Sequence, residues 1–338
     1  MKIVLICNNY GQKFDGIGAY SHKIYSGFDV DVCTAITRPE KNFMRIFGLG
    51  MSISVLKASI KLMSGHYANV IIEYPFVEWN PLFCFVVLWL KLITIVTKVN
   101  MVVSLHEFVR VNYLRRVVII YLALLADTVL VTEKENFRKL KEWNDNIHKI
   151  EIPSNIEFSN DVKVKDTKQF VFFGIVNKAK AFNEMLEAWD IFNENKEYKL
   201  VILTSSKLDG MENHKNVEYV YNASDEEVKN IMLESAFSIV PIKPYVDEKN
   251  ATFKASCLAG CVSIGKFCDE YKRLHGVKNL DNYTTSSFLE IFNECKSVCV
   301  NEVEEFQKNI REYSRIFTIE NTRCRIMGIL GDDSETFD

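Results

Sequence analysis

Short apolar runs alternate with longer segments of mixed polarity through the first half of the chain. The runs are rich in Val, Ile and Leu, which is typical of strands buried on both faces of a sheet. The segments between them are long enough for crossover helices, so the pattern predicts a doubly wound parallel α/β sheet. The predicted strands are Lys2–Cys7, Val30–Thr37, Val70–Tyr74, Met101–Leu105 and Thr128–Thr132, and the predicted helices are about ten residues from Ala19, Asn42–Ser64, Pro81–Thr97, Tyr113–Ala126 and Glu133–Trp143.

The alternation restarts in the second half, after a polar segment that contains Pro153 and has the composition of an interdomain linker. We therefore predict two Rossmann-like domains at residues 1–150 and 163–316, a linker at 151–162, and a final helix with a tail at 317–338. Two such sheets imply a cleft between the domains that binds a ligand. The predicted strands here are Gln169–Gly174, Tyr198–Thr204, Val217–Tyr221, Phe237–Val240 and Val262–Ile264, and the predicted helices are Phe182–Asn193, Ser224–Glu234, Thr252–Gly260, Thr285–Lys296, Val303–Tyr313 and Ile319–Leu330.

Composition narrows the class of protein. A chain of 338 residues is too long for one ordinary core, and a hydrophobic content of 48% excludes a disordered protein. The formal net charge of −3 gives no sign of a nucleic-acid partner. The nine cysteines are scattered without zinc-ligand spacing, and the first residues lack the features of a signal peptide. We expect a cytoplasmic protein with free or buried thiols and no metal site.

One stretch, Pro81–Thr97, is apolar throughout except for Lys91. Its length is at the lower limit for a membrane span, and a central lysine is costly in lipid, so a buried or membrane-apposed helix is favoured. The basic residues Arg110, Arg115 and Arg116 follow in the same domain. Apolar and basic surface together suit an anionic membrane and a lipid-linked acceptor. An ordinary buried helix with nearby surface charges is the alternative.

Residues 236–265 predict a strand, a polar loop, a helix and a second strand in quick succession. Ligands of parallel sheets bind beyond the carboxyl ends of the strands, and a helix start offers N–H groups and a positive dipole end to an anion. We therefore expect Asn250, Thr252 and Lys254 to contact a charged ligand, and predict that Thr252 caps the helix. Asp247 and Glu248 lie in the preceding loop, where solvated acids are equally typical.

Two further loops follow predicted strands and carry groups suited to phosphate. Gly16 and Gly18 precede the first helix, where glycine permits close approach of a ligand to the backbone; a plain tight turn is the alternative. After the strand that ends at Gly174, a loop carries Lys178 and Lys180. A lysine so placed can neutralise a diphosphate, although most loop lysines are simply solvated.

His106 follows the predicted strand Met101–Leu105, at the carboxyl edge of the first sheet. A histidine in this position can donate to a sugar hydroxyl or take part in proton transfer. A structural histidine is the alternative.

Several pieces of the sequence occur in the order known from one protein family. They are GIGAY from Gly16, VVSLHE at 102–107, ADTVLVTEKENFRKL at 126–140, IPSN at 152–155, FFG followed by a lysine and LEAW between Phe172 and Trp189, NVEYVYNASDEEVKNIM from Asn216, LAGCVSI from Leu258 and FTIENTRCRIMGIL from Phe317. In this order they resemble the GT-B fold glycosyltransferases of the family-4 type, glycosyl transferases group 1, over nearly the whole chain.

The resemblance implies a domain organisation and a set of roles. The N-terminal domain would bind the acceptor, the C-terminal domain would bind a nucleotide diphosphate sugar, and the last helix would cross back to the first domain. Gly16 and Gly18 would lie near the donor phosphates and the transferred sugar, His106 would face that sugar, and Lys180 would hold the diphosphate. Gly174 would be a further donor contact. Asp247 and Glu248 are candidates for contact with the sugar.

Two positions depart from the family pattern. An arginine usually follows the glycine at the strand end, and here that position is Ile175. The E-x7-E motif is also lost, because counting back from Gly260 places Asp247 at the first acidic position and Ala255 at the second. The second glutamate normally holds the nucleotide ribose, so here either other groups hold it or the nucleotide is not bound in the usual way.

The resemblance therefore implies a hexosyltransferase, and we expect it to be metal-independent. It would move a sugar from a nucleotide diphosphate sugar to a glycan or lipid-linked acceptor, in bacterial surface polysaccharide biosynthesis such as that of O-antigen, lipopolysaccharide or capsule. Contact with the inner face of the cell membrane stays open. One alternative is a sugar-nucleotide epimerase of the same fold. Another, suggested by Ile175 and Ala255, is a catalytically weakened sugar-nucleotide-binding or assembly protein.

Overall fold

The protein divides into two compact units. The first contains Met1–Glu151 together with Ile319–Asp338, and the second contains Ile152–Thr318. The computed structural model describes residues 1–12, 15–35, 49–75, 82–109, 111–158, 163–208 and 213–331. Residues 152–158, which the sequence suggested as a linker, count with the second unit.

The first unit contains a six-stranded sheet in the order β2-β1-β3-β4-β5-β6, and every pair of neighbours is parallel. The inner strands are buried except at Lys2 and Asn100, the first residues of β1 and β4, as their apolar runs predict. The short polar edge strand β6 was not predicted. The strands are β1 (Lys2–Asn8), β2 (Asp29–Ala35), β3 (Asn69–Tyr74), β4 (Asn100–Leu105), β5 (Thr128–Val131) and β6 (Ile147–Lys149).

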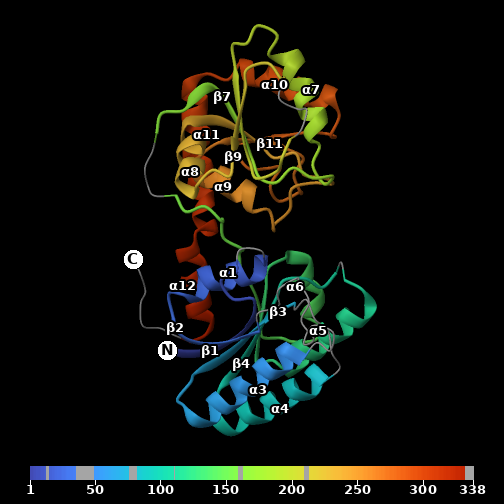
Figure 1. Cartoon of the computed structure of the whole chain (residues 1–338), viewed down its shortest axis with the longest axis vertical. Helices are drawn as coiled ribbons and strands as arrows, with labels where there is room; N and C mark the ends of the chain where they lie inside the picture. Colours follow the sequence, from blue (N-terminus) through green and yellow to red (C-terminus); the bar gives the residue numbers. More distant parts are fainter. Residues whose placement is uncertain are drawn as a thin grey trace. The chain divides into compact units, whose positions relative to one another are not determined.

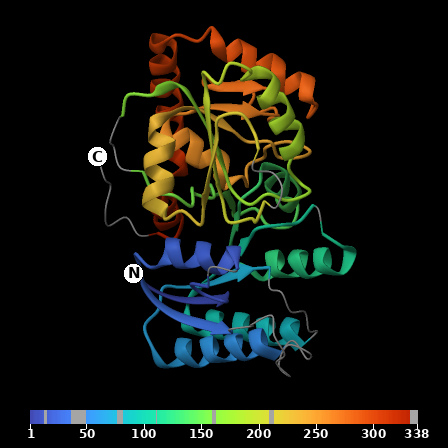
Figure 2. The same ribbon diagram turned by 45° about the horizontal axis from the view of Figure 1, so that its top comes forward.

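Helices cover both faces of this sheet (Figures 1 and 2). One face packs against α3 (Leu49–Ser64), α4 (Leu82–Thr97) and α5 (Tyr113–Leu125), and the other packs against α1 (Gly16–Tyr25) and α12 (Ile319–Ile329). A short helix, α6 (Lys134–Leu140), follows β5.

The last helix, α12, belongs to the first unit although it lies at the far end of the chain. Its Ile319 and Ile326 pack in one apolar cluster with Ile3 and Leu5 of β1. The Arg323 guanidinium donates a hydrogen bond of 2.9 Å to the carbonyl oxygen of Ile24 in α1. The chain therefore closes the first unit with residues from both of its ends.

The second unit contains another parallel six-stranded sheet, in the order β12-β11-β10-β7-β8-β9. The chain proceeds from β7 toward β9 on one side and continues with β10 on the other, so the strand order reverses between β7 and β10. Such switch points are where open parallel sheets bind ligands. The strands are β7 (Asp166–Phe173), β8 (Lys199–Thr204), β9 (Val217–Tyr221), β10 (Ser235–Ile239), β11 (Val262–Gly265) and β12 (Val277–Asn279), the last of which was not predicted.

Helices cover both faces of the second sheet as well (Figure 1). One face packs against α7 (Phe182–Phe192) and α10 (Thr285–Lys296), and the other packs against α8 (Asp225–Glu234) and α9 (Ala251–Ala259). The helix α11 (Val300–Ser314) contacts α9, and the turn η1 (Arg315–Phe317) ends the unit.

All nine cysteines are free thiols. Among the residues that the structure describes, no group of three or more His, Cys, Asp and Glu side chains could hold a metal ion. No helix in the same part of the chain is long and apolar enough to cross a membrane.

An aromatic cluster forms the centre of the core beside α7. Trp189 is completely buried, and its ring meets Phe170 at 5.3 Å and Phe292 at 5.9 Å between centroids. Its indole N–H donates to the carbonyl oxygen of Lys215 at 2.8 Å. These contacts join helices α7 and α10 to strand β7.

We expect Trp189→Ala to lower the free energy of unfolding of the second unit by about 3–5 kcal/mol, because it leaves a large cavity and removes one of the two hydrogen bonds that the Lys215 carbonyl oxygen accepts. Ile191, two residues away in α7, has a 57% exposed side chain, so Ile191→Ala should change that free energy by no more than about 0.5 kcal/mol. Urea unfolding of both variants measures the difference. Equal losses would contradict the described packing of α7.

Candidate functional site

A cavity of about 440 Å³ lies in the second unit, where β7 and β8 end and α9 begins. Lys180 is the one residue with an ionisable side chain among the described residues that line it. The rest of the lining mixes apolar side chains with amides and hydroxyls. The lining residues are Asn155, Phe173, Gly174, Ile175, Asn177, Lys180, Leu203, Thr204, Ser205, Asn222, Ala223, Val228, Ile242, Ala251 and Thr252.

Lys180 is held in place through its backbone. The N–H of Ala181 donates to the carbonyl oxygen of Pro241 at 2.8 Å, and the N–H of Lys243 donates to that of Ala179 at 2.8 Å. Lys180 itself forms an antiparallel bridge with Ile242. The loop after β7 is thereby tied to the segment after β10, which fixes the base of the lysine at the switch point.

The Lys180 ammonium lies in a partly dry environment. Its Nζ is 4.7 Å from the centroid of the Phe172 ring. Burial lowers the pKa of this group from the ordinary 10.5 to about 8, because the charged form loses hydration. An anion bound beside Lys180 would restore the favourable environment for the positive charge.

Gly174 allows two polar groups to meet at the end of β7. Its φ of +127° lies in a region that favours glycine. A Cβ atom at this position would lie 2.8 Å from Lys180 Nζ and 3.5 Å from Thr252 Oγ1. Three residues predicted to bind the donor are thus brought together around the space that a side chain would fill.

The helix start at α9 differs from the prediction in its cap. Asn250, not Thr252, is the N-cap, and its side-chain oxygen accepts a hydrogen bond of 2.7 Å from the N–H of Phe253. Thr252 lies in the first turn and lines the cavity instead. The positive end of the α9 dipole therefore faces the same space as Lys180.

Lys254 is not placed at the cavity, which corrects the prediction that it contacts the ligand. Its side chain is completely buried, and its Nζ donates a hydrogen bond of 2.6 Å to the carbonyl oxygen of Ile152. The same Nζ lies 5.0 Å from the centroid of the Phe317 ring. Its role is to hold these two segments of the second unit against α9.

Asp247 and Glu248 lie in the loop before α9, and both are half-buried. The Asp247 carboxylate accepts the N–H of Lys249 at 3.1 Å, and its carbonyl oxygen accepts the N–H of Asn250. Neither acid is among the described residues that line the cavity. Asp247 shapes the turn that presents Asn250 to the helix.

The two positions that depart from the family pattern have different surroundings. Ile175 is 60% exposed and lines the cavity, so an apolar side chain stands where an arginine is usual. Ala255 is completely buried in an apolar cluster with Val171 and Leu203. A carboxylate at Ala255 would have to enter that core, which would cost several kcal/mol as a rough magnitude.

His106 belongs to a buried polar group in the first unit. Its Nε2 lies 2.6 Å from Oε2 of Glu73, a completely buried residue of β3, and the Tyr25 hydroxyl donates to the other oxygen of Glu73 at 2.6 Å. The Tyr20 ring packs edge-on against the His106 ring. Burial, followed by the Glu73 charge, raises the pKa of Tyr20 and Tyr25 well above 10, so both stay neutral.

Glu73 was not among the residues predicted from the sequence. The sequence feature that could have identified Glu73 is a carboxylate inside the apolar run NVIIEY, because an acid on a buried strand needs a partner. Strands β3 and β4 are neighbours with Tyr74 opposite Leu105, which places Glu73 beside the residue after β4.

Gly16 and Gly18 do not form the predicted loop. Helix α1 begins at Gly16, three residues before the predicted start at Ala19, and the Asp15 carboxylate caps it by accepting from the N–H groups of Ile17 and Gly18 at 3.0 and 3.1 Å. A Cβ atom on Gly18 would lie 2.1 Å from the Asn9 carbonyl oxygen, so this glycine permits close packing of α1 on the end of β1. The Asp15 charge occupies the place predicted for a phosphate.

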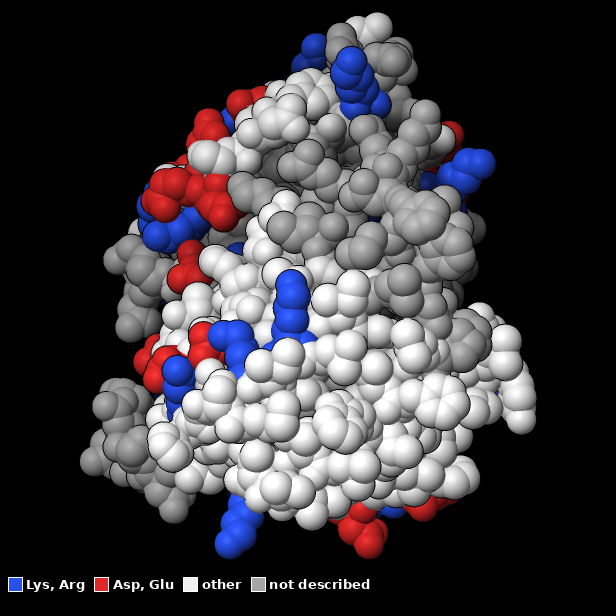
Figure 3. All heavy atoms as spheres, turned by 60° about the horizontal axis from the view of Figure 1, so that its bottom comes forward, with Lys and Arg blue, Asp and Glu red and all other residues white. Residues whose placement is uncertain are grey.

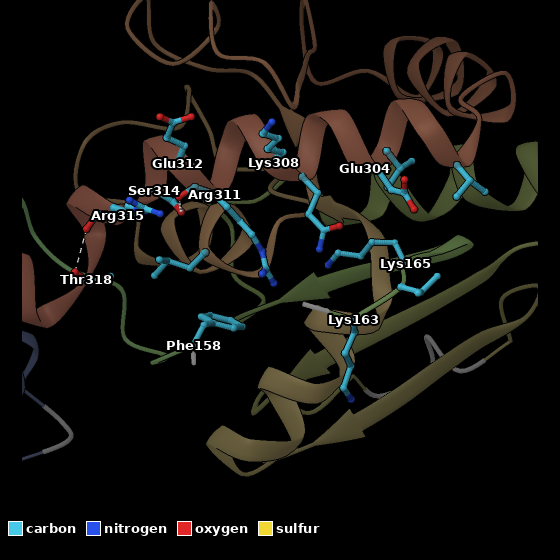
Figure 4. Close-up of a pocket in the computed structure, with 15 residues that line it drawn as sticks. Phe158, Lys163, Lys165, Glu304, Lys308, Arg311, Glu312, Ser314, Arg315 and Thr318 are labelled. Carbon is cyan, nitrogen blue, oxygen red and sulfur yellow. Dashed lines mark hydrogen bonds between the residues drawn. The ribbon is translucent and has the colours of Figure 1, made fainter. Parts of the chain in front are cut away.

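A larger cavity, of about 840 Å³, lies elsewhere in the second unit beside α11 (Figure 4). Arg311 extends from α11 into it in the figure, and its guanidinium lies 3.5 Å from the Ala259 carbonyl oxygen. Lys165 Nζ donates to the carbonyl oxygens of Ala259 and Met232 at 2.8 and 2.9 Å. These cations satisfy carbonyl groups at a helix end. We therefore take the smaller cavity, beside Lys180, as the candidate site.

No family model and no curated protein matches the chain. Solved structures do match over its full length. A glycosyltransferase from Rickettsia africae ESF-5 is 12% identical, with 99% of each chain covered and a TM-score of 0.67. WaaG, a glycosyltransferase involved in lipopolysaccharide biosynthesis, is 10% identical over 98% of this chain and 100% of its own, with a TM-score of 0.62. This chain has the GT-B fold.

A third GT-B match is an α-glucosyltransferase solved in complex with UDP-glucose and DNA containing an abasic site. It is 15% identical over 98% of this chain and 99% of its own, with a TM-score of 0.59. The fold predicted from the sequence is confirmed by these likenesses. Assignment of this GT-B chain to the family-4 type stays a prediction.

The low pKa of Lys180 is open to direct measurement. We expect the Lys180 resonance of the reductively ¹³C-methylated GT-B protein to titrate near pH 8, well below the ordinary lysine pKa of 10.5, because burial disfavours the charged amine. Lys180→Met identifies the resonance. Since the pKa falls on folding, Lys180 should cost stability at neutral pH, and this cost should disappear as the pH rises from 8 toward 10.5. A Lys180 resonance that titrates near pH 10.5 would contradict the described burial.

Proposed function

We propose that this GT-B protein is a glycosyltransferase, and that its second unit binds the nucleotide diphosphate sugar in the cavity beside Lys180. The observation that carries the proposal is the meeting of Lys180 Nζ, Thr252 Oγ1 and the start of α9 around Gly174. A single cation, a hydroxyl and a positive helix end, without a carboxylate among the described lining residues, suit a diphosphate.

The proposed chemistry places the main demand on the leaving group. Glycosyl transfer passes through an oxocarbenium-like state while negative charge grows on the departing diphosphate. Lys180 and the α9 start would stabilise that charge. They would do so without a metal ion, because both supply fixed positive potential where the charge develops.

The nucleoside needs partners other than the usual carboxylate. Ser205, at the end of β8, and Asn222, at the end of β9, line the cavity and can hydrogen-bond a ribose or a base. The α-glucosyltransferase structures contain UDP, so UDP-sugars are the first donors to test.

His106 is the proposed contact to the transferred sugar. Because Nε2 faces Glu73, this role falls to Nδ1, and the buried carboxylate sets the ring's orientation and tautomer. Asp247 and Glu248 stay candidates for sugar hydroxyls, since both lie half-buried in the loop before α9.

The proposed acceptor is a glycan or a lipid-linked sugar bound by the first unit, in bacterial surface polysaccharide biosynthesis on the cytoplasmic side of the membrane. The likeness to WaaG supports this pathway class. One neighbour was solved with DNA, but a net charge of −3 gives this chain little attraction for a polyanion.

Lys180→Ala should lower donor turnover by about 10²–10³-fold, because it removes the main charge opposite the leaving group. Lys178→Ala, in the same loop with an exposed side chain, should leave turnover unchanged. The measurement is release of UDP or GDP from a panel of nucleotide sugars, with and without lipid-linked acceptors, and thermal unfolding confirms that both variants fold. An active Lys180→Ala protein would exclude the assignment.

The second candidate function is a sugar-nucleotide-binding protein with weakened catalysis, which the apolar Ile175 and the buried Ala255 favour. The same panel separates the two functions. Donor binding that depends on Lys180, without hydrolysis or transfer under any condition, would support the binding protein.

Glu73→Gln and His106→Ala should each lower turnover by about 10²-fold or more while leaving the affinity for UDP unchanged, because both act on the sugar and not on the diphosphate. The glutamine keeps an oxygen for the Tyr25 hydroxyl but removes the charge that faces His106. Turnover at the wild-type rate in Glu73→Gln, with UDP affinity intact, would show that this polar group is structural.

A further inference from the structure

Helices α3, α4 and α5 expose an unusual number of large apolar side chains on the first unit. These residues form what we call the apolar face, which lies on the side of the three helices away from the sheet. Its members are Ile53, Leu56, Ile60 and Met63 of α3, Leu82, Phe85, Leu88, Trp89, Leu92, Ile95 and Val96 of α4, and Tyr113, Leu114, Val117 and Leu124 of α5.

Helix α4 is apolar on both of its sides. Phe83 and Val87 are buried against the sheet, whereas Phe85 is 71% exposed and Val96 is 79% exposed. A surface helix of a soluble domain normally turns a polar stripe to water. Figure 3 shows the resulting surface as a broad uncharged area with most of the charged atoms at its margins. An apolar area of this kind marks an interaction site.

Charge indicates what covers the face. The three helices together carry five lysines and arginines and no aspartate or glutamate. Removing these five charges from the chain's net −3 leaves −8 for the remainder. The rest of the chain is therefore net acidic, whereas the three described helices that carry the apolar face contain no acidic residue. This pairing of apolar and basic groups matches an anionic lipid surface.

The individual cations divide into two groups. Lys61, Lys91 and Arg115 are paired with Asp31, Asp127 and Glu107 on neighbouring strands and loops. Lys57 is exposed between Leu56 and Ile60. Arg116 is also exposed and has no acidic partner among the ion pairs of the described residues, and its guanidinium lies over the Phe108 ring and donates to the Val109 carbonyl oxygen at 3.0 Å. Lys57 and Arg116 are therefore the described cations placed to meet lipid headgroups, while Arg110 lies outside the described residues.

A membrane span and a second copy of the chain fit less well. Helix α4 has 16 residues, and at about 1.5 Å per residue it falls short of a hydrocarbon core about 30 Å thick. Its inner side is also part of the protein core. Two copies joined through this face would bring like charges together, which opposes association.

We infer that the apolar face lies in the interfacial region of an anionic membrane, with Phe85 and Trp89 inserted among the lipids. Trp side chains are favoured at this depth, and Lys57 and Arg116 can extend to the headgroups. This surface would hold the first unit where a lipid-linked acceptor is found. The inferred membrane surface thus deepens the proposed function and rests on it, although binding to vesicles does not require the donor site.

The test uses the full-length protein and flotation with vesicles of phosphatidylcholine, alone or mixed with phosphatidylglycerol. We expect flotation with the mixed vesicles at low salt, and weaker flotation at high salt or with phosphatidylcholine alone. The double variant Phe85→Gln, Trp89→Gln should bind the mixed vesicles at least about tenfold more weakly, because two large apolar side chains no longer insert. Lys57→Glu should weaken binding to the mixed vesicles only.

Ile191→Gln is the matched control, since Ile191 is a comparably exposed apolar residue on a helix of the second unit, and it should float like the wild type. No flotation at low salt, or equal flotation of the double variant, would overturn the inference. The inference would also be overturned if the wild type sedimented as a dimer without lipid and the double variant sedimented as a monomer. UDP binding by the same proteins keeps this outcome separate from the proposed function: intact UDP binding with no flotation contradicts only the membrane surface.

Discussion

Two backbone hydrogen bonds between the segment after β7 and the segment after β10 fix the position on which the candidate site depends. They set Lys180 at the switch point of the second sheet, opposite Ile242. Gly174 then leaves open the volume that Lys180 Nζ and Thr252 Oγ1 border. A half-buried lysine held in this way loses little further conformational freedom when an anion binds, which is the physical meaning of a preorganised site.

The sequence was most informative where a local pattern decides the structure. The inner strands follow from their apolar runs, and the loop glycine and lysine at Gly174 and Lys180 follow from strand ends. Strands β6 and β12 were missed because short polar edge strands carry no apolar run. Lys254 was misplaced because two residues beyond Thr252 is about 200° around a helix, which turns its side chain into the core.

Other parts of the site depend on tertiary structure that no local pattern contains. Glu73 and His106 meet only through the register of β3 and β4, and Tyr25 joins them from α1. Gly16 and Gly18 fit a phosphate loop in sequence, but the cap is decided by Asp15, which lies just before them. The exposure of side chains also depends on tertiary packing. The composition of α4 predicted a buried or membrane-apposed helix, and only the packed structure shows that α4 is buried on one side and exposed on the other.

The position of α12 has a consequence for how this protein is made. Residues 152–318 form the second unit without interruption, so that unit can fold while the chain is still being synthesised. The first unit cannot be completed at that stage, because the face that contains Ile3 and Leu5 is covered by Ile319 and Ile326, which follow the whole second unit in the chain. The first unit is therefore finished after the second although most of its sequence comes first, and premature termination near residue 318 would spare the second unit and leave the first with an open core.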